Sequence, residues 1–387
     1  MKMKKLTLLI SIFLLAATAS AESIWPVFIN GIYYNESNGE AVVVSGEYPD
    51  GYPTGTIVIP DHITVNNQDY PVTTLGPESL NWIRNGQILV LPSSITAIDS
   101  YVVGEGAVVQ IPEDNNIEHI FHGALECAQL PETIHLPKIK TLGAGVLCGT
   151  EPSESIVLGP DLSILGNCFG ETPSIRIKEN TDPNSHGSTL TIGKKALNGI
   201  LCKEFCFPTK AHLILGDEIG TKCKNLERVV FPDYKEIDYD PIARYDDFTS
   251  ITTVCSNLFT NCPMLKEAVC LGATPPEFNI PQRFFEEGYV NQPTKVFRII
   301  DNCENCILKV PAGSEELYRA HPVWGLFKQI VGFENGNYNA IDPPDIDTEN
   351  TQECTRYFNL NGIEVDHPAN GNLYIRRSAT KTEKIIF

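Results

Sequence analysis

Short runs in which apolar and polar residues alternate, each closed by a proline or a glycine, recur along most of the chain. Alternation with a period of two is typical of a β-strand that buries one face. A proline ends such a strand because it has no N–H group for the ladder and a fixed φ. Nine short strands are therefore predicted: TIVIP (56–60), ILVLP (88–92), VVQIP (108–112), TIHLP (133–137), SIVLG (155–159), TLTIG (189–193), EFCFP (204–208), RVVFP (228–232) and ILKVP (307–311).

The segments between these strands also repeat. After each stop come an isoleucine or leucine, a glycine or alanine, an apolar pair and often a cysteine, as in IKTLGAGVLCG (139–149) and LSILGNCFG (162–170). The stops at 60, 92, 112, 137 and 159 are separated by 32, 20, 25 and 22 residues. This spacing brackets the period of leucine-rich repeats, about 20–29 residues. One unit cannot bury its apolar face alone, so stacked units with a parallel strand ladder are predicted.

The repeat resembles the BspA-type leucine-rich repeats of surface proteins from anaerobic oral and gut bacteria, whose typical unit reads L-x-x-I-x-I-P-x-x-V-x-x-I-G-x-x-A-F-x-x-C. The resemblance covers about residues 28–333. FINGIYYN (28–35) resembles the opening hairpin of that family, with Asn30 and Gly31 as a two-residue turn. The resemblance implies an α/β solenoid: a short-strand ladder with irregular or short helical returns, a β-hairpin N-terminal cap and a small β C-terminal module.

The end of the repeat region resembles the closing unit of the same family. GATPPEF (272–278) is followed by a segment at 308–333 that matches that unit. There Ser314 is expected to cap a short helix whose first turn carries Glu315 and Glu316.

Composition divides the chain into successive parts. Two polar or acidic stretches, at 178–188 and 233–248, are interpreted as insertions on one face of the solenoid. The C-terminal stretch alternates as short strands with turns at Asn361-Gly362 and Asn370-Gly371, and resembles C-terminal modules of exported proteins from the same bacteria. The expected parts are a signal peptide (1–21), a capping segment (22–55), the solenoid (56–333) with its closing unit at about 303–333, a linker (334–353) and a β-module that is a candidate sorting signal (354–387).

The N-terminal residues predict export. Three lysines precede an apolar stretch at 6–15, and small residues at 19–21 supply a cleavage site, as in a secretory signal peptide. We therefore expect a protein at the cell surface, on the outer-membrane exterior or secreted, with no membrane insertion after signal removal. Removing the signal removes three lysines and no acids, so the net charge of −19 becomes 26 minus 48, or −22. This charge disfavours nucleic acid as a partner.

The twelve cysteines are the first candidates for chemistry. Five of them end a repeat, where stacking predicts buried free thiols: Cys127, Cys148, Cys168, Cys223 and Cys262. Cys303 and Cys306 form a C-x-x-C pair, which is a candidate disulfide, redox pair or zinc pair. A zinc site is disfavoured because no second C-x-x-C accompanies it.

Two other groups could ligate a metal. His119-x-x-His122 fits a repeat return better than a metal site. The acids at 238, 240, 246 and 247 lack the oxygen spacing of an EF-hand loop. No metal, cofactor or catalytic residue is therefore predicted.

These observations favour a non-enzymatic binding module. The resemblance implies an adhesin or interaction protein whose partner is a host or bacterial surface protein or glycan. The alternatives are a structural surface-layer protein without a specific ligand and a glycan-active enzyme. Exposed aromatic residues on one face would favour ligand binding. A cleft with convergent carboxylates would favour an enzyme. The candidate binding positions are the outward strand positions, such as His135, and the insertions.

Overall fold

The computed structural model describes residues 24–48, 52–148, 155–169, 171–180, 188–240, 257–279 and 298–334, and three further strands between 356 and 386. The predicted signal peptide lies outside these residues. The chain forms two compact units, which divide between Tyr338 and Asn339. The first unit contains the cap and the repeats, and the second contains the C-terminal strands.

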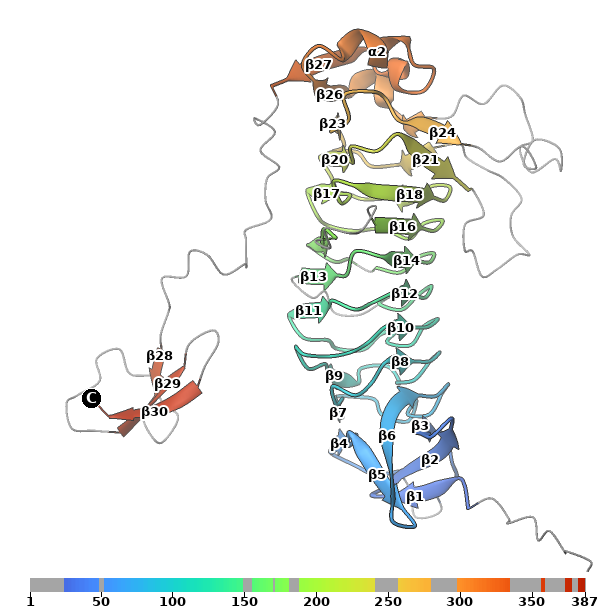
Figure 1. Cartoon of the computed structure of the whole chain (residues 1–387), viewed down its shortest axis with the longest axis vertical. Helices are drawn as coiled ribbons and strands as arrows, with labels where there is room; N and C mark the ends of the chain where they lie inside the picture. The colour runs from blue at the N-terminus through green and yellow to red at the C-terminus, as the bar shows by residue number, and fades with distance from the viewer. Residues whose placement is uncertain are drawn as a thin grey trace, which may run out of the picture. The chain divides into compact units, whose positions relative to one another are not determined.

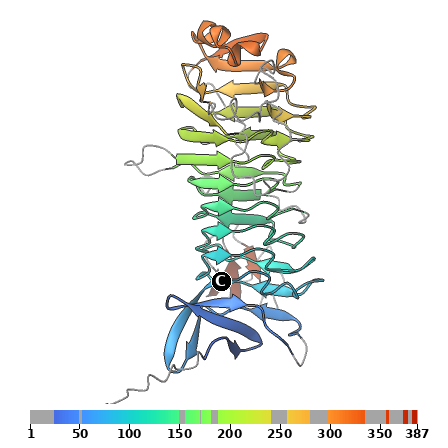
Figure 2. The same cartoon turned by 90° about the vertical axis from the view of Figure 1, so that its right-hand side faces the viewer.

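Each repeat of the first unit forms one rung that contains two short strands (Figure 1). In the rung that begins at Thr133, the first strand is β11 (Thr133–Leu136) and the second is β12 (Thr141–Leu142). The next rung repeats this order with β13 (Ser155–Leu158) and β14 (Leu162–Ile164). Strand β11 pairs with β13 and β12 pairs with β14, both in parallel. The rungs therefore stack into two parallel ladders, which Figure 2 shows from the side.

The second strands of the rungs build the long ladder, which in the described residues is a 13-stranded sheet that includes the cap. Its strands besides β12 and β14 are β1 (Val27–Ile29), β2 (Ile32–Ser37), β3 (Glu40–Val44), β5 (His62–Val65), β6 (Gln68–Leu75), β8 (Ala97–Ile98), β10 (His119–Ile120), β16 (Ser188–Ile192), β18 (Ala211–Leu215), β21 (Glu236–Tyr239) and β24 (Glu277–Asn279).

The first strands build the broken ladder, which is divided into sheets of three, three and five strands. Its strands besides β11 and β13 are β4 (Thr56–Val58), β7 (Ile88–Val90), β9 (Val108–Gln110), β15 (Ile175–Ile177), β17 (Glu204–Cys206), β20 (Arg228–Phe231), β23 (Glu267–Cys270), β26 (Ile307–Pro311) and β27 (Gln329–Phe333).

The remaining elements of the first unit are short. A three-stranded sheet contains β19 (Gly220–Thr221), β22 (Asn257–Thr260) and β25 (Arg298–Ile300). The closing unit adds the 3₁₀-helix η1 (Cys303–Asn305), the helix α2 (Glu315–Ala320) and the 3₁₀-helix η2 (Trp324–Leu326).

Alternation along the strands builds the core. In β11, Ile134 and Leu136 are buried and His135 between them is exposed, as the sequence predicts. Each rung adds such residues to one continuous apolar cluster that runs from Ile32 to Ile330. A core leucine or isoleucine contributes about 1.5–3 kcal/mol by leaving water, so stacking is what makes each rung stable. The leucine-rich-repeat solenoid predicted from the sequence is confirmed.

The small residues of the sequence pattern form the turn after each second strand. In successive rungs Tyr101, Gly123, Gly145 and Asn167 have positive φ values of 54°, 59°, 70° and 51°. Glycine adopts this left-handed conformation without strain. At Gly123 a Cβ atom would also meet the Tyr101 ring at 2.5 Å. The glycines of the repeat are therefore explained by both backbone conformation and the close stacking of rungs.

The cap begins with the predicted hairpin. Strands β1 and β2 are antiparallel, and Ile29 pairs with Ile32 across the two-residue turn. Asn30 and Gly31 have φ values of 50° and 83°, as a type I′ turn requires.

Two details of the repeat interpretation were wrong. Each return contains the second strand, because two or three residues, as in Leu162–Ile164, already suffice to pair with the next rung. TLTIG (189–193) was assigned to the first strands, but it lies in β16 of the long ladder, and the first strand of that rung is β15. Both ladders have the same alternation, so the pattern alone does not distinguish them.

The stretches interpreted as insertions are partly built into the ladders. Residues Glu236–Tyr239, within the acidic stretch 233–248, form β21 and pair with β18 and β24, so this part is not an insertion. The rest of that stretch beyond 240, and most of the polar stretch 178–188, lie outside the described residues.

The closing helix forms where it was predicted, and Glu315 and Glu316 occupy its first turn. Ser314 is the residue before the helix, but its side chain makes no capping hydrogen bond, because its backbone is already helical at φ −96° and ψ −7°. The expected cap at Ser314 was therefore wrong.

The second unit is a small antiparallel sheet. It contains β28 (Arg356–Phe358), β29 (Leu373–Arg377) and β30 (Thr382–Ile386) in that order. The predicted turns at 361–362 and 370–371, and the linker beyond 334, lie outside the described residues. A sorting role for this unit stays a prediction.

Candidate binding surface

The outer face of the cap hairpin carries aromatic side chains. Alternation in β2 directs Ile32 and Tyr34 into the core, where their exposed fractions are 2% and 1%. The opposite face carries Tyr33, which pairs with Phe28 of β1. The two rings contact each other with centroids 4.6 Å apart. A hairpin at the end of a solenoid normally turns polar residues to water on this face, so the two rings are an unusual feature.

Three more rings extend this contact to the first rung. Tyr48 contacts Phe28 and Tyr33, with centroid distances of 6.0 and 5.3 Å. Tyr52 lies 4.8 Å from Tyr48 and stacks on Trp82 at 5.2 Å, with only 15° between the ring planes. We call Phe28, Tyr33, Tyr48, Tyr52 and Trp82 the cap aromatic cluster.

The cluster has a buried base and exposed rings. Trp82 is 5% exposed, whereas Phe28 and Tyr52 are 55% and 53% exposed. The Tyr33 hydroxyl donates to the Glu47 carbonyl oxygen at 2.6 Å, which fixes that ring. Burial raises the pKa of Tyr48, so its phenol is neutral at physiological pH. Large exposed rings held in place by their neighbours lose little conformational entropy when a ligand covers them.

The charge around the cluster is one-sided. Residues 24–83 contain seven acidic residues and no lysine or arginine, and Arg84 follows directly after this segment. The acids are Glu36, Glu40, Glu47, Asp50, Asp61, Asp69 and Glu78. The cap therefore has a negative field that no lysine or arginine of the same segment offsets, and His62 pairs with Asp61.

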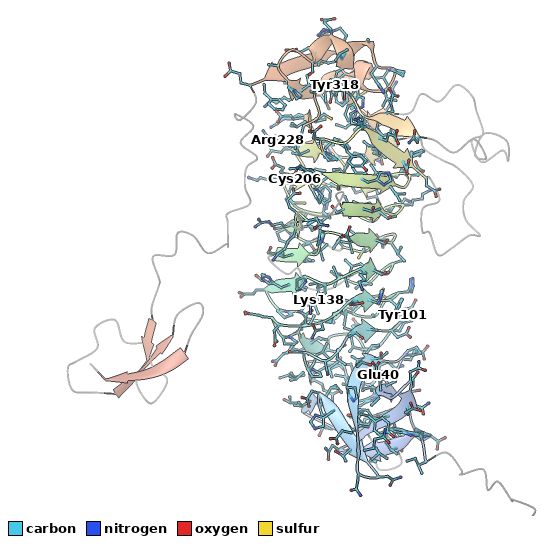
Figure 3. The ribbon with its side chains drawn as sticks, in the orientation of Figure 1. Glu40, Tyr101, Lys138, Cys206, Arg228 and Tyr318 are labelled. Atoms are coloured by element: carbon cyan, nitrogen blue, oxygen red, sulfur yellow. The ribbon has the colours of Figure 1, made fainter. Side chains whose placement is uncertain are left out.

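A second aromatic patch lies on the middle of the long ladder. Tyr101, labelled in Figure 3, is 43% exposed, and its ring contacts His122 of the next rung at 5.2 Å. His119 of β10 stacks on Phe121, which is 39% exposed, at 5.9 Å. The His119-x-x-His122 pair thus forms part of an aromatic surface. Among the described residues, no group of three or more histidine, cysteine or acidic side chains could hold a metal ion.

Paired charges occupy part of the outer face of the broken ladder, on strands β17, β20, β23 and β26. Arg228, which is labelled in Figure 3, pairs in register with Glu204 and Glu267 on the two neighbouring strands. It pairs with Glu204 at 2.9 Å and also with Glu267, which in turn pairs with Lys309 at 2.8 Å. Glu204 and Glu267 are only 9% and 12% exposed. Each of these side chains has a partner of opposite charge, so the ion pairs explain why charged residues occupy these nearly buried positions.

The cysteines at the repeat ends are free thiols. Cys168, Cys223 and Cys262 are buried, and Cys127 and Cys148 are half-buried. Cys168 is fully enclosed, and burial raises its pKa above the ordinary thiol range. The structure therefore supports packing for these residues. Two further cysteines, at 255 and 354, lie outside the described residues.

The candidate disulfide lies in the closing unit. Cys303 and Cys306 are both buried, and both are thiols in the structure. The Cys303 thiol donates to the Leu326 carbonyl at 3.7 Å, and the Cys306 thiol to the Leu265 carbonyl at 3.3 Å. Burial raises the pKa of Cys306 to about 11. A disulfide between them stays a prediction.

The cap aromatic cluster was not predicted from the sequence, although the alternation along the hairpin indicated part of it. Residues 28–35 were predicted to form a hairpin, and period-two alternation already places Phe28 and Tyr33 on one face, opposite Ile32 and Tyr34. The contributions of Tyr48, Tyr52 and Trp82 depend on how the cap folds against the first rung, which a single sequence does not reveal.

Comparison with protein-family models and with curated proteins gave no match. Among solved structures, the chain is similar to a leucine-rich repeat protein from Bacteroides ovatus, at 17% identity and a TM-score of 0.28 over 76% of this chain and 81% of that one. It is similar to a leucine-rich cell surface protein from Faecalibacterium prausnitzii, at 12% identity and a TM-score of 0.25 over 71% and 100%. It is also similar to the pneumococcal vaccine antigen PcpA, at 13% identity and a TM-score of 0.28 over 80% and 98%.

The similarity to these structures is low, and the repeat architecture of this chain rests on its own two ladders. Within the described residues, no helix combines the length and the apolar character needed to cross a membrane.

Proposed function

We propose that this chain is an exported, non-enzymatic leucine-rich-repeat protein, at the cell surface or secreted, that binds a surface protein or glycan through the cap aromatic cluster. The observation that carries the proposal is the pair of half-exposed rings, Phe28 and Tyr52, on a base of packed aromatic residues. The signal-peptide pattern at 1–21 supports export.

Aromatic residues are the side chains that most often dominate binding energy at protein interfaces. Their exposure costs free energy in the unbound state, because each ring leaves apolar area in contact with water. A cap could be completed by short polar residues at lower cost. A role in ligand binding explains why the outer face of the hairpin carries large rings instead.

The structural alternative predicts a polar outer surface with no preferred contact. The long ladder partly fits that description, because its outward positions include Thr141 and Ser163. The cap does not, and this difference favours a ligand-binding role over a purely structural one.

The test is a glycan array and a panel of immobilised matrix proteins, probed with the purified full-length chain and with a Phe28→Ala/Tyr52→Ala variant. We expect at least one saturable ligand whose binding the variant reduces at least tenfold. A Tyr101→Ala/Phe121→Ala variant is the matched control, since it removes two rings of similar exposure from the long ladder.

The absence of any saturable ligand for the unmodified chain would contradict the proposal. Equal loss of binding in both double variants would also contradict it, because the contact would then not be specific to the cap.

A further inference from the structure

We propose that the cap aromatic cluster binds a basic segment of a partner protein, and that arginine or lysine side chains of that segment lie against the exposed faces of Tyr52 and Phe28. The inference rests on the proposed function and specifies the chemistry of the ligand. Three observations carry it: the exposed ring faces, their separation and the charge of the cap.

The first observation concerns which ring faces are free. One face of Tyr52 is covered by Trp82, since the two rings stack with 15° between their planes. Tyr48 also lies 4.8 Å from Tyr52, yet 53% of the residue is exposed, so part of its ring is open to solvent. Phe28 is similarly exposed and is held against Tyr33 at 4.6 Å. The face of an aromatic ring carries negative potential and attracts a guanidinium or ammonium group within about 6 Å.

The second observation concerns spacing. Phe28 and Tyr52 both contact Tyr48. Their ring centroids lie 6.0 and 4.8 Å from the Tyr48 centroid, respectively. Two side chains on the same face of an extended peptide are about 7 Å apart. Because both rings contact Tyr48, we expect basic residues at alternate positions of one extended segment to reach both of them.

The third observation concerns charge. The seven acids and the absence of lysine and arginine in 24–83 give the cap a field that favours a cation over a neutral or anionic group. Glu47, whose carbonyl holds Tyr33, is exposed beside the rings. The patch on the long ladder differs, since its two aromatic rings lie beside His119 and His122, and Lys140 pairs there with Glu118 at 2.6 Å. Two similar aromatic surfaces therefore differ in the charge that surrounds them.

The test uses fluorescein-labelled peptides and fluorescence anisotropy at about 150 mM salt, where surface charges more than about 8 Å apart are screened. The probes are Gly-Arg-Gly-Arg-Gly, the same peptide with lysine, and the same peptide with glutamate or leucine. We expect saturable binding of the arginine and lysine peptides and much weaker binding of the other two.

Two variants separate ring chemistry from general attraction to an acidic protein. Tyr52→Leu keeps an apolar side chain but removes the ring, and we expect it to weaken the arginine peptide about fivefold, the equivalent of about 1 kcal/mol for one cation–π contact. Tyr52→Phe keeps the ring and should bind within about twofold of the unmodified chain. Tyr101→Leu, on the long ladder, should leave binding unchanged. Circular dichroism of each variant checks that it is folded.

The outcomes distinguish this inference from the function on which it rests. If Tyr52→Leu binds the arginine peptide as well as Tyr52→Phe does, the attraction is to the acidic surface in general, and the inference is overturned. If the array identifies a neutral glycan that depends on Phe28 and Tyr52 while no basic peptide binds, the proposed function stands and the inference is overturned. If neither ligand class binds, both are overturned.

Discussion

The two ends of the solenoid are both rich in aromatic residues, but they use them differently. At the closing end, Trp324 contacts Phe231, Phe278 and Tyr318, with centroid distances of 5.4, 5.9 and 5.8 Å. Trp324 and Tyr318 are completely buried. At the opening end, the rings of the cap aromatic cluster also contact one another, but two of them remain half exposed.

The polar atoms of the rings show the same difference. The Tyr318 hydroxyl, labelled in Figure 3, donates to the Gly272 carbonyl at 2.7 Å, and Trp324 Nε1 donates to the Pro276 carbonyl at 3.0 Å. Both bonds join residues more than 40 positions apart and connect the closing unit to the segment that precedes β24. The aromatic residues of the closing unit therefore end the core, whereas those of the cap extend beyond it.

The largest expected effect is on stability at the closing end. Trp324→Ala removes a fully buried ring, and we expect the free energy of unfolding to fall by about 3–5 kcal/mol. Tyr52→Ala, the matched change at the cap, should cost about 1 kcal/mol or less, because half of that residue is already exposed. Urea denaturation followed by circular dichroism measures both. Equal losses at the two ends would contradict the distinction between a core-closing and a surface cluster.

A smaller effect is expected from removing single hydroxyl groups. Tyr318→Phe leaves the buried Gly272 carbonyl without its donor, which should cost about 1–3 kcal/mol. Tyr33→Phe removes the bond to Glu47, whose carbonyl is accessible to water, and should cost about 0.5 kcal/mol or less. The same denaturation measurement applies to both. A cost for Tyr33→Phe as large as that for Tyr318→Phe would show that the cap rings are structural.

The contrast between the two ends also shows what the sequence could reveal. The strand pattern and its proline stops predicted the stacked rungs, because burial of one strand face leaves a period of two in the sequence. The closing helix was predicted at the right residues, since Glu315 and Glu316 mark its first turn. The long ladder was not predicted, because Thr141 and Leu142 are too short a pair to show a period.

The candidate site was the least predictable part. Cysteines and histidines were the candidate residues in the sequence because they can ligate metals or react. In the structure, Cys168 is packed in the core and His119 lies in an aromatic patch. Phe28 and Tyr52 are ordinary apolar residues in a sequence, and only the fold shows that they are exposed and connected through Tyr48. A binding surface built from aromatic residues is therefore hard to distinguish from a core before the structure is known.

The smallest expected effect is a difference in alkaline stability between the two ends. The sequence has no cysteine before Cys127, whereas the closing end contains buried thiols. Burial raises the pKa of Cys270 from 9.0 to about 12 and that of Cys306 to about 11. Between pH 9 and these values the folded state keeps protons that the unfolded state has lost. Stability is therefore fully present below pH 9 and falls as the pH rises, by about 1 kcal/mol per pH unit for each thiol.

Rungs of a repeat protein can unfold separately, so the two ends can be followed with different tryptophans. A Trp324→Phe variant leaves Trp25 and Trp82 as reporters of the cap, and a Trp25→Phe/Trp82→Phe variant leaves Trp324 as the reporter of the closing end. Between pH 8 and pH 10.5 we expect the melting temperature reported by Trp324 to fall more than that reported by the cap. A Cys270→Ala change should flatten the slope at the closing end, while Val58→Ala, at an exposed position of the broken ladder, should leave it unchanged. Parallel slopes from both reporters would mean that the solenoid unfolds as one cooperative unit, and the two ends would then differ in surface chemistry alone.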